Sequence, residues 1–202
     1  SNGQGIFDFQ DRNCVNRKVR LLEWIAGELY SNFSPKNDDL RYSLGFSGGQ
    51  IVNLLTDFDH NLSKRTFDWD IANGLWVEKN LEIFDEDEKE IIIYYLEKFK
   101  EIQPIYEHLR KSTIHNDAND NNIIVDKIGG QVKAIIDYGD AVYSQIINDL
   151  SVILAYACMD FEQPLLAALP VVKGYNDAFQ LEDEELKILY VAVAIRLVIS
   201  VT

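Results

Sequence analysis

The chain has 202 residues, of which 47% are hydrophobic and 26% are charged, a balance typical of a folded domain rather than a disordered one. Its 19 basic and 33 acidic residues give a formal net charge of −14, which argues against partners such as nucleic acid or an anionic membrane and permits amines or metal ions. The distant pair Cys14 and Cys158, the lack of a long apolar run and the lack of a signal peptide favour a cytoplasmic protein.

The first elements are predicted to be strands. Residues 5–9 and 18–25 are apolar or alternate in polarity, and a polar turn at 11–13 separates them, which is typical of a β-hairpin. Gly27 then ends the second strand. Two helices are expected next, over residues 38–58 with Asn37 or Asp38 as N-cap, and over residues 67–77.

The clearest helix is predicted over residues 85–110. Asp85 is a good N-cap, and the acidic residues 86–88 suit the positive end of the helix dipole. An apolar stripe at helical spacing runs from Ile91 onward, and Pro104 is expected to end or kink the helix.

From residue 112 the pattern changes to short strands around a polar loop. A short strand at 112–114 precedes the polar run, and a hairpin of 122–125 with 132–136 follows it. Further helices are expected at 149–159, around 163–172 and from about 183. Front strands, a helical body and one small hairpin set into it predict an α+β fold.

The polar run His-Asn-Asp-Ala-Asn-Asp-Asn-Asn at 115–122 carries the candidate chemistry. Phosphoryl transfer needs a carboxylate that aligns the attacking hydroxyl, together with oxygen ligands that hold Mg²⁺ against the phosphates. Asp117 lies five residues before Asn122, the spacing found in kinase catalytic loops. Asp137 follows an apolar strand and precedes a glycine-containing turn, where its carboxylate could complete the set.

These segments resemble a known family. HNDANDNNIIVD and AIIDYGDA are similar to the HGDxxxxN and IIDFGDA-type motifs of the aminoglycoside phosphotransferase and choline kinase-like family. Asn119-Asp120, FDHNLSKRTFDWDIANGLW and VRLLEWIAGELY resemble the hydroxylysine kinase group, which includes the kinase-like domain fused to class III aminotransferases. The resemblance implies a protein-kinase-like fold, with a remnant of the small nucleotide-covering lobe and hinge at 1–26 and a mostly helical large lobe at 27–202.

The same resemblance implies roles for the site residues. Asp117 is expected to be the catalytic base or the residue that orients the hydroxyl, and Asn122 and Asp137 are expected to bind Mg²⁺. The purine of ATP or GTP is expected against the backbone of the hinge residues Glu23, Trp24 and Ile25. His115 is expected to anchor the loop, and Asp149 to cap the following helix and brace the loop.

Four residues are candidates for the acceptor side, each with a structural alternative. Asp140 could contact an amine or be a solvated turn residue. Trp69 and Asp70 could line the acceptor pocket, although a Trp at helical spacing is more often part of the core. Arg196 could meet a substrate carboxylate or form a buried salt bridge.

Two departures from the family pattern stand out. Asn116 replaces the usual Gly, and Asn is the next best residue if this position needs a positive φ. No phosphate-covering loop, strand Lys or helix Glu precedes the hairpin at 5–25. We therefore expect a piece of a larger protein, truncated at its C-terminal end as well, that transfers phosphate poorly by itself.

Three functions follow as hypotheses. The first is transfer of the γ-phosphate of a nucleotide to the hydroxyl of a small amine-containing acceptor, an amino alcohol or hydroxy amino acid like hydroxylysine, homoserine or choline. The second is a non-catalytic kinase-like domain that positions a covalently fused enzyme, such as an aminotransferase. The third is phosphoester hydrolysis by His115, Asp117, Asp120 and Asp137. This chemistry usually requires two metal ions about 4 Å apart.

Overall fold

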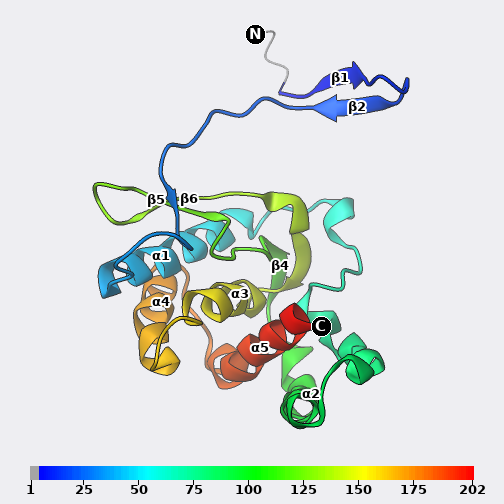
Figure 1. Cartoon of the computed structure of the whole chain (residues 1–202), viewed down its shortest axis with the longest axis vertical. Helices are drawn as coiled ribbons and strands as arrows, with labels where there is room; N and C mark the ends of the chain where they lie inside the picture. Colours follow the sequence, from blue (N-terminus) through cyan, green and yellow to red (C-terminus); the bar gives the residue numbers. More distant parts are fainter. Residues whose placement is uncertain (1–4) are drawn as a thin grey trace.

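A computed structural model describes residues 5–202 and has the predicted α+β composition (Figure 1). The helices are α1 (Asp38–Leu55), α2 (Glu86–Tyr106), α3 (Ile147–Ala157), α4 (Pro164–Ala178) and α5 (Asp183–Val201). The strands are β1 (Phe7–Gln10), β2 (Asn16–Val19), β3 (Glu28–Leu29), β4 (Lys111–Ile114), β5 (Ile123–Val125), β6 (Val132–Ile135) and β7 (Val142–Gln145). Three 3₁₀ helices, η1 (Asn61–Ser63), η2 (Ile71–Ile83) and η3 (Tyr138–Asp140), complete the elements.

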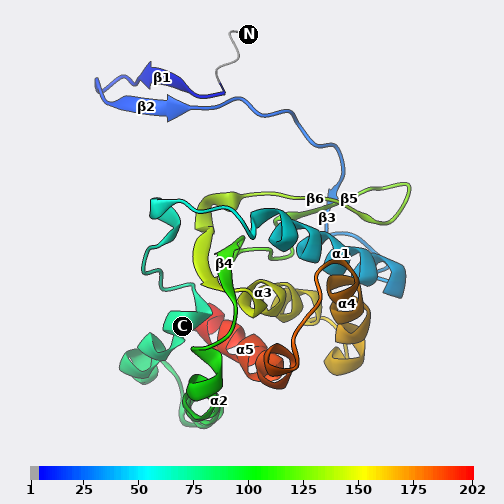
Figure 2. The same cartoon turned by 180° about the vertical axis from the view of Figure 1, so that it is seen from behind.

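The predicted N-terminal hairpin is present, but its second strand is shorter than expected. Strands β1 and β2 pair antiparallel, with Phe7 opposite Val19. Residues 20–26 form no strand, so the prediction of a strand over 18–25 is wrong beyond Val19. This segment is instead an exposed connection that separates the hairpin from the helical body in both views (Figures 1 and 2).

The chain enters the body at Gly27 and pairs with the central hairpin. Strand β3 joins β5 to give the order β3-β5-β6, all antiparallel. A methyl group at Gly27 would lie 2.7 Å from the carbonyl oxygen of Val125, so this close approach to β5 requires glycine. The predicted hairpin of β5 and β6 is confirmed, with Ile123 opposite Ile135.

Helix α1 begins where expected and packs closely on α4. The side chain of Asn37 accepts a hydrogen bond from the Leu40 N–H at 2.9 Å, as an N-cap does. The helix runs through Gly48-Gly49 to Leu55, and its glycines are at packing contacts, Gly45 and Gly49 against α4 and Gly48 against Ile153 on α3. A methyl group at Gly49 would lie 2.7 Å from the carbonyl oxygen of Tyr175, so these glycines permit the close crossing of the two helices.

Helix α2 confirms the expected start and ends four residues early. Asp85 and Glu88 form a reciprocal capping box, and Pro104 lies in the last turn before the helix ends at Tyr106. The helix predicted over 67–77 is displaced, because Asp70 caps the following segment and η2 runs from Ile71 to Ile83.

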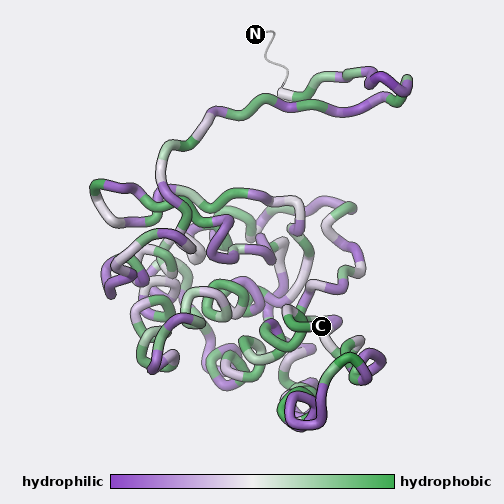
Figure 3. Tube along the Cα trace, viewed as in Figure 1, coloured by the Kyte–Doolittle hydropathy of each residue, from purple (hydrophilic) through white to green (hydrophobic). Residues whose placement is uncertain are grey.

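The hydrophobic core is formed by residues of α1 to α5, η2 and strands β5 and β6. Hydrophobic residues run through α3 and α5 (Figure 3), and Leu150, Ile153 and Ile195 are fully buried there. Strands β4 and β7 pair with Ile114 opposite Val142. The loop that follows β4 and the turn that precedes β7 therefore lie at the same end of this pair. Within residues 5–202, no helix is long and apolar enough to cross a membrane.

Candidate active site

The polar loop after β4 is anchored by a buried carboxylate on α3. Oδ1 of Asp149 accepts hydrogen bonds from the backbone N–H groups of His115 at 3.1 Å and Asn116 at 3.3 Å. Burial raises the pKa of Asp149, and the neighbouring His115 opposes that effect. The expectation that Asp149 caps α3 is wrong, because the helix starts at Ile147 and Ile146 occupies the N-cap position. It braces the loop from within the first turn.

His115 joins the polar loop to the end of β6. Its Nδ1 accepts the backbone N–H of Asp117 at 3.2 Å, so the ring proton is assigned to Nε2, which donates to the carbonyl oxygen of Ile136 at 3.0 Å. The ring is fully buried and packs 4.5 Å from the ring of Tyr138. Both ring nitrogens are occupied, which fits an anchor rather than a proton carrier.

Asn116 has the left-handed backbone conformation that its place in the sequence suggested. Its φ is 65°, where glycine and asparagine are favoured. The side chain is fully buried, and its amide nitrogen and oxygen have no hydrogen-bond partner among residues 5–202. The loop therefore tolerates Asn at this turn while leaving its amide unpaired.

Asp117 is held by donors on both carboxylate oxygens. Oδ1 accepts from Nδ2 of Asn119 at 2.9 Å and from Nη2 of Arg196 at 3.3 Å. Oδ2 accepts from Nδ2 of Asn122 at 2.7 Å. The side chain remains about one-fifth exposed, at 21%, so part of it is still accessible to solvent.

Asn122 and Asp137 lie next to each other where the β5–β6 hairpin ends. The backbone N–H of Ile136 donates to the carbonyl oxygen of Asn122 at 2.9 Å, which brings the two residues together. Nδ2 of Asn122 is committed to Asp117, whereas its Oδ1 has no hydrogen bond from the described part of the chain. Asp137 is exposed, with a φ of 65°, and its Oδ1 accepts the N–H of Gly139 at 3.2 Å.

This pair of side chains fits a magnesium site. Mg²⁺ prefers oxygen ligands and takes one or two from the protein while phosphates and water supply the rest. Oδ1 of Asn122 and the carboxylate of Asp137 are oxygens of that kind, and the orientation of the Asn122 amide leaves its oxygen available. Among residues 5–202, no three His, Cys, Asp or Glu side chains form a metal-binding group, which gives the two-metal hydrolysis hypothesis no support.

Asp140 adds a further negative charge to this region. Burial and the neighbouring Asp117 and Asp137 raise the pKa of Asp140, while Arg65 opposes them. Nη2 of Arg65 donates to the carbonyl oxygens of Gly139 at 2.9 Å and Ala141 at 3.4 Å, on either side of Asp140. Arg65 was not among the candidate residues predicted from the sequence, although Arg65 lies in a segment that resembles the hydroxylysine kinase group.

Asp70 lies in the packed interior, not at an acceptor pocket. It is 3% exposed and accepts hydrogen bonds from Oγ of Ser144 at 2.8 Å and Nδ2 of Asn148 at 3.1 Å. It also accepts the backbone N–H of Ala72, which caps η2. The expectation that it contacts a substrate does not fit, because its carboxylate is used by the fold.

Trp69 and Arg196 contact each other. Nη1 of Arg196 donates to the carbonyl oxygen of Trp69 at 2.8 Å, and its guanidinium lies 5.0 Å from the Trp69 ring centre. Arg196 is buried and pairs with Asp117, so of its two predicted roles the structure has the salt bridge.

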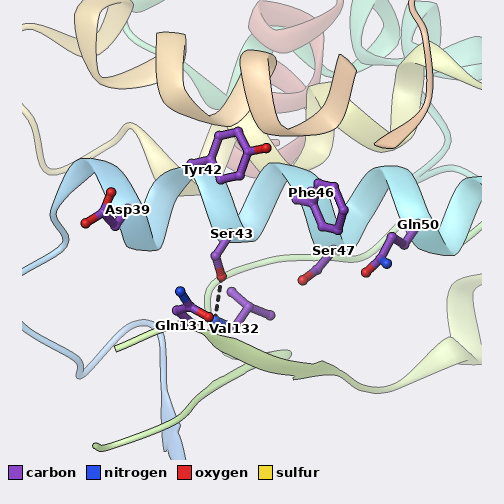
Figure 4. A pocket seen from close by; sticks show the side chains of 8 residues that line it. All are labelled: Asp39, Tyr42, Ser43, Phe46, Ser47, Gln50, Gln131 and Val132. Atoms are coloured by element: carbon purple, nitrogen blue, oxygen red, sulfur yellow. Dashed lines mark hydrogen bonds between the residues drawn. The ribbon is translucent and has the colours of Figure 1, made fainter. Parts of the chain in front are cut away.

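The hinge residues Glu23, Trp24 and Ile25 lie in the exposed connection between β2 and β3, and no hydrogen bond among residues 5–202 joins them to this cluster. A separate groove of about 300 Å³ lies between α1 and the start of β6 (Figure 4). Tyr42 and Phe46 line it from α1, and Ser43 accepts the backbone N–H of Val132 beside it. No predicted site residue lines this groove, so the polar loop and the turn after β6 form the candidate site.

The sequence is similar to curated hydroxylysine kinases. It is 26% identical over 191 residues to hydroxylysine kinase of Mus musculus, covering 88% of this chain and 50% of that protein. It is 25% identical over 195 residues to the Xenopus laevis hydroxylysine kinase, covering 88% of this chain and 51% of that protein. The chain spans about half the length of these relatives.

Solved structures share the fold at lower identity. A microcompartment-associated aminopropanol kinase matches with a TM-score of 0.73 and 18% identity, covering 98% of this chain and 64% of that chain. An amicoumacin kinase in complex with AMP-PNP, Ca²⁺ and Ami matches with a TM-score of 0.69 and 18% identity, covering 99% and 61%.

A family model confirms the resemblance seen in the motifs. It matches residues 3–183, which include the polar loop, the β5–β6 hairpin and Asp137. The chain therefore belongs to the phosphotransferase enzyme family (APH), with hydroxylysine kinases as distant homologues.

Proposed function

We propose that this chain carries the catalytic loop of a small-molecule kinase, which moves the γ-phosphoryl group of ATP or GTP to the hydroxyl of a small amino alcohol or hydroxy amino acid. The observation that carries the proposal is the arrangement of Asp117, Asn122 and Asp137. The Asp117 carboxylate accepts a hydrogen bond from the side-chain amide of Asn122, and the backbone of Asn122 is bonded to Ile136, the residue before Asp137. Phosphoryl transfer uses such a set for positioning and charge stabilisation.

In this proposal each residue does what its surroundings allow. Asp117 accepts a hydrogen bond from the acceptor hydroxyl and aims its oxygen at the phosphorus, while Asn119, Asn122 and Arg196 keep the carboxylate from turning. Oδ1 of Asn122 and the carboxylate of Asp137 would hold Mg²⁺. When bound, the ion neutralises phosphate charge.

An amine-containing acceptor is supported by charge. Asp140 lies in the same negative region as Asp117 and Asp137, and the chain has a net charge of −14. A cationic amine would be attracted there. The relatives named as hydroxylysine kinase and aminopropanol kinase suggest acceptors that carry both a hydroxyl and an amine.

The same proposal assigns the parts of the fold. Residues 27–202 would be the large lobe, and residues 1–26 the end of the small lobe and the hinge. The backbone of Glu23, Trp24 and Ile25 would meet the purine. We propose a cytoplasmic location on the composition and cysteine usage alone.

The experiment is phosphate transfer from labelled ATP or GTP to a panel of hydroxy amines. It uses the chain and any longer polypeptide that contains it, with Mg²⁺ present. Asp117→Asn is expected to lower kcat by about 10²–10⁴-fold, because proton acceptance and alignment are lost, with Mg-nucleotide binding unchanged. Asp87→Asn, in the exposed first turn of α2, is the matched control.

Full activity of Asp117→Asn would overturn the assignment. Nucleotide binding without transfer to any acceptor, in the longest polypeptide as well, would favour the non-catalytic hypothesis in which the domain positions a fused enzyme.

A further inference from the structure

One short segment of the chain binds both the turn that follows Asp137 and the arginine that holds Asp117. This brace segment, residues 65–70, begins at Arg65, whose Nη2 donates to the backbone of the turn that follows Asp137. It continues to Trp69, whose carbonyl oxygen accepts from Arg196, and Arg196 in turn donates to Asp117. The brace segment thus connects the two halves of the candidate site.

The end of the brace segment is fixed in the core. Asp70 is buried and bonded to Ser144 on β7 and Asn148 on α3. Asn148 also donates to the hydroxyl of Tyr106 at 2.7 Å, in the last turn of α2. Because the segment is bonded to β7 and α3 at one end, and α3 is in turn bonded to α2, its contacts with the site have a rigid support.

Burying the charged guanidinium of Arg196 costs free energy, because the charge is removed from water. Arg196 is 1% exposed, and its ion pair with Asp117 is a single contact at 3.3 Å. Its Nε has no hydrogen-bond partner among residues 5–202, and its guanidinium lies 5.0 Å from the ring centre of Trp69 and 5.6 Å from that of Tyr156. An incompletely paired buried charge is weak evidence for stability, so its contact with Asp117 is the better explanation of its presence.

Arg65 acts on the other half of the site. Asp137 has a φ of 65°, a conformation that is uncommon for Asp and needs support from its surroundings. Arg65 provides such support, because it crosses 74 residues of sequence to bind the carbonyl of Gly139 and also reaches that of Ala141. Its guanidinium is well suited to hold two carbonyl oxygens of one turn.

We propose that Arg65 and Arg196 are positioning residues for phosphoryl transfer, coupled through the brace segment. Arg65 holds the turn that presents Asp137 to the metal ion, and Arg196 holds the carboxylate of Asp117 in line with the acceptor hydroxyl. The catalytic part of this proposal rests on the proposed function, whereas the positioning part concerns the order of the loop and the turn. The two arginines therefore control different quantities, metal affinity and turnover.

The test compares Arg65→Gln and Arg196→Met with Arg110→Gln. Arg110 also forms an ion pair, with Glu185 at the start of α5, and donates to the carbonyl oxygen of Gln180. These residues do not belong to the cluster described above. Arg65→Lys and Arg196→Lys are included because they keep the charge and the length, so they remain informative if a larger change impairs folding.

The first readout is Mn²⁺ binding in the presence of ADP, followed by water-proton relaxation. Arg65→Gln is expected to weaken Mn²⁺ binding about tenfold, as loss of a residue that orients a metal ligand does. Arg196→Met is expected to leave Mn²⁺ binding unchanged and to lower kcat about 10–100-fold without changing the KM for nucleotide. The lysine variants should recover part of each effect, and Arg110→Gln should change neither.

The second readout is backbone hydrogen exchange, which needs no activity. Exchange is expected to rise at 137–141 in Arg65→Gln, at 115–122 in Arg196→Met, and at 65–70 in both. Unchanged exchange at these places, or the same changes in Arg110→Gln, would overturn the proposal. If the longest polypeptide that contains the wild-type chain phosphorylates no acceptor, the proposed function fails, and Mn²⁺ binding with hydrogen exchange still decides whether the arginines position the site.

Discussion

Replacing Asp149 by alanine is expected to release the candidate catalytic loop from the body of the protein. The carboxylate is 1% exposed, and one of its oxygens accepts the backbone N–H groups of both His115 and Asn116. These two N–H groups are buried at the start of the loop. The variant therefore leaves two buried donors unpaired.

The size of the effect follows from these two hydrogen bonds. A hydrogen bond to a charged group contributes about 1.5–3 kcal/mol, so the pair contributes about 3–6 kcal/mol. Burial penalises the charged form and raises the pKa of Asp149, which favours the lower end of that range. Asp149→Asn keeps an oxygen in place and loses the charge, so it should cost about half as much.

Urea unfolding followed by circular dichroism measures both variants. The expected order of unfolding free energy is wild type, then Asp149→Asn, then Asp149→Ala, with similar dependence on urea. Hydrogen exchange at residues 115–118 should rise in the same order. A loss of less than about 1 kcal/mol in Asp149→Ala, the value of one ordinary hydrogen bond, would show that another group anchors the loop and would refute this reasoning.

Two further predictions concern packing and pH. Gly174→Ala should lower the free energy of unfolding by about 1–3 kcal/mol, because the methyl group would overlap the α1 backbone near Tyr42 and Phe46. Thermal unfolding measures this loss. The control Gly5→Ala should be neutral, because no atom lies within 4 Å of the added methyl group. Burial raises the folded-state pKa of Asp70 above 3.8, so its contribution to stability is greatest below that pH and is lost as the pH rises through the raised pKa. The unfolding free energy of wild type minus that of Asp70→Asn should therefore fall with rising pH, and an increase would contradict the assignment.

The parts of the fold that could be predicted are those with local signals. The start of α2 follows from Asp85 and the acidic residues after it, because a capping box is made by residues three apart. The β5–β6 hairpin follows from two short apolar runs around a glycine turn. Both patterns need only neighbours in the sequence.

The errors occurred where distant partners decide the outcome. Leu21, Leu22 and Trp24 look like a strand, yet the connection at 20–26 has no strand beside it, and β2 ends at Val19. A strand exists only where another strand completes its hydrogen bonds. The helix expected over 67–77 shifted because Asp70 serves as a cap rather than a helical residue.

The same distinction explains which candidate site residues the sequence pointed to. Asp117 and Asn122 are five residues apart, and Asp137 is one hairpin away, so spacing alone relates them. Arg196 reaches Asp117 across 79 residues, and the sequence left its role open between substrate contact and salt bridge. Local spacing therefore points to the groups proposed to perform the chemistry, while the role of the cation that holds Asp117 becomes visible only when the folded chain brings distant segments together.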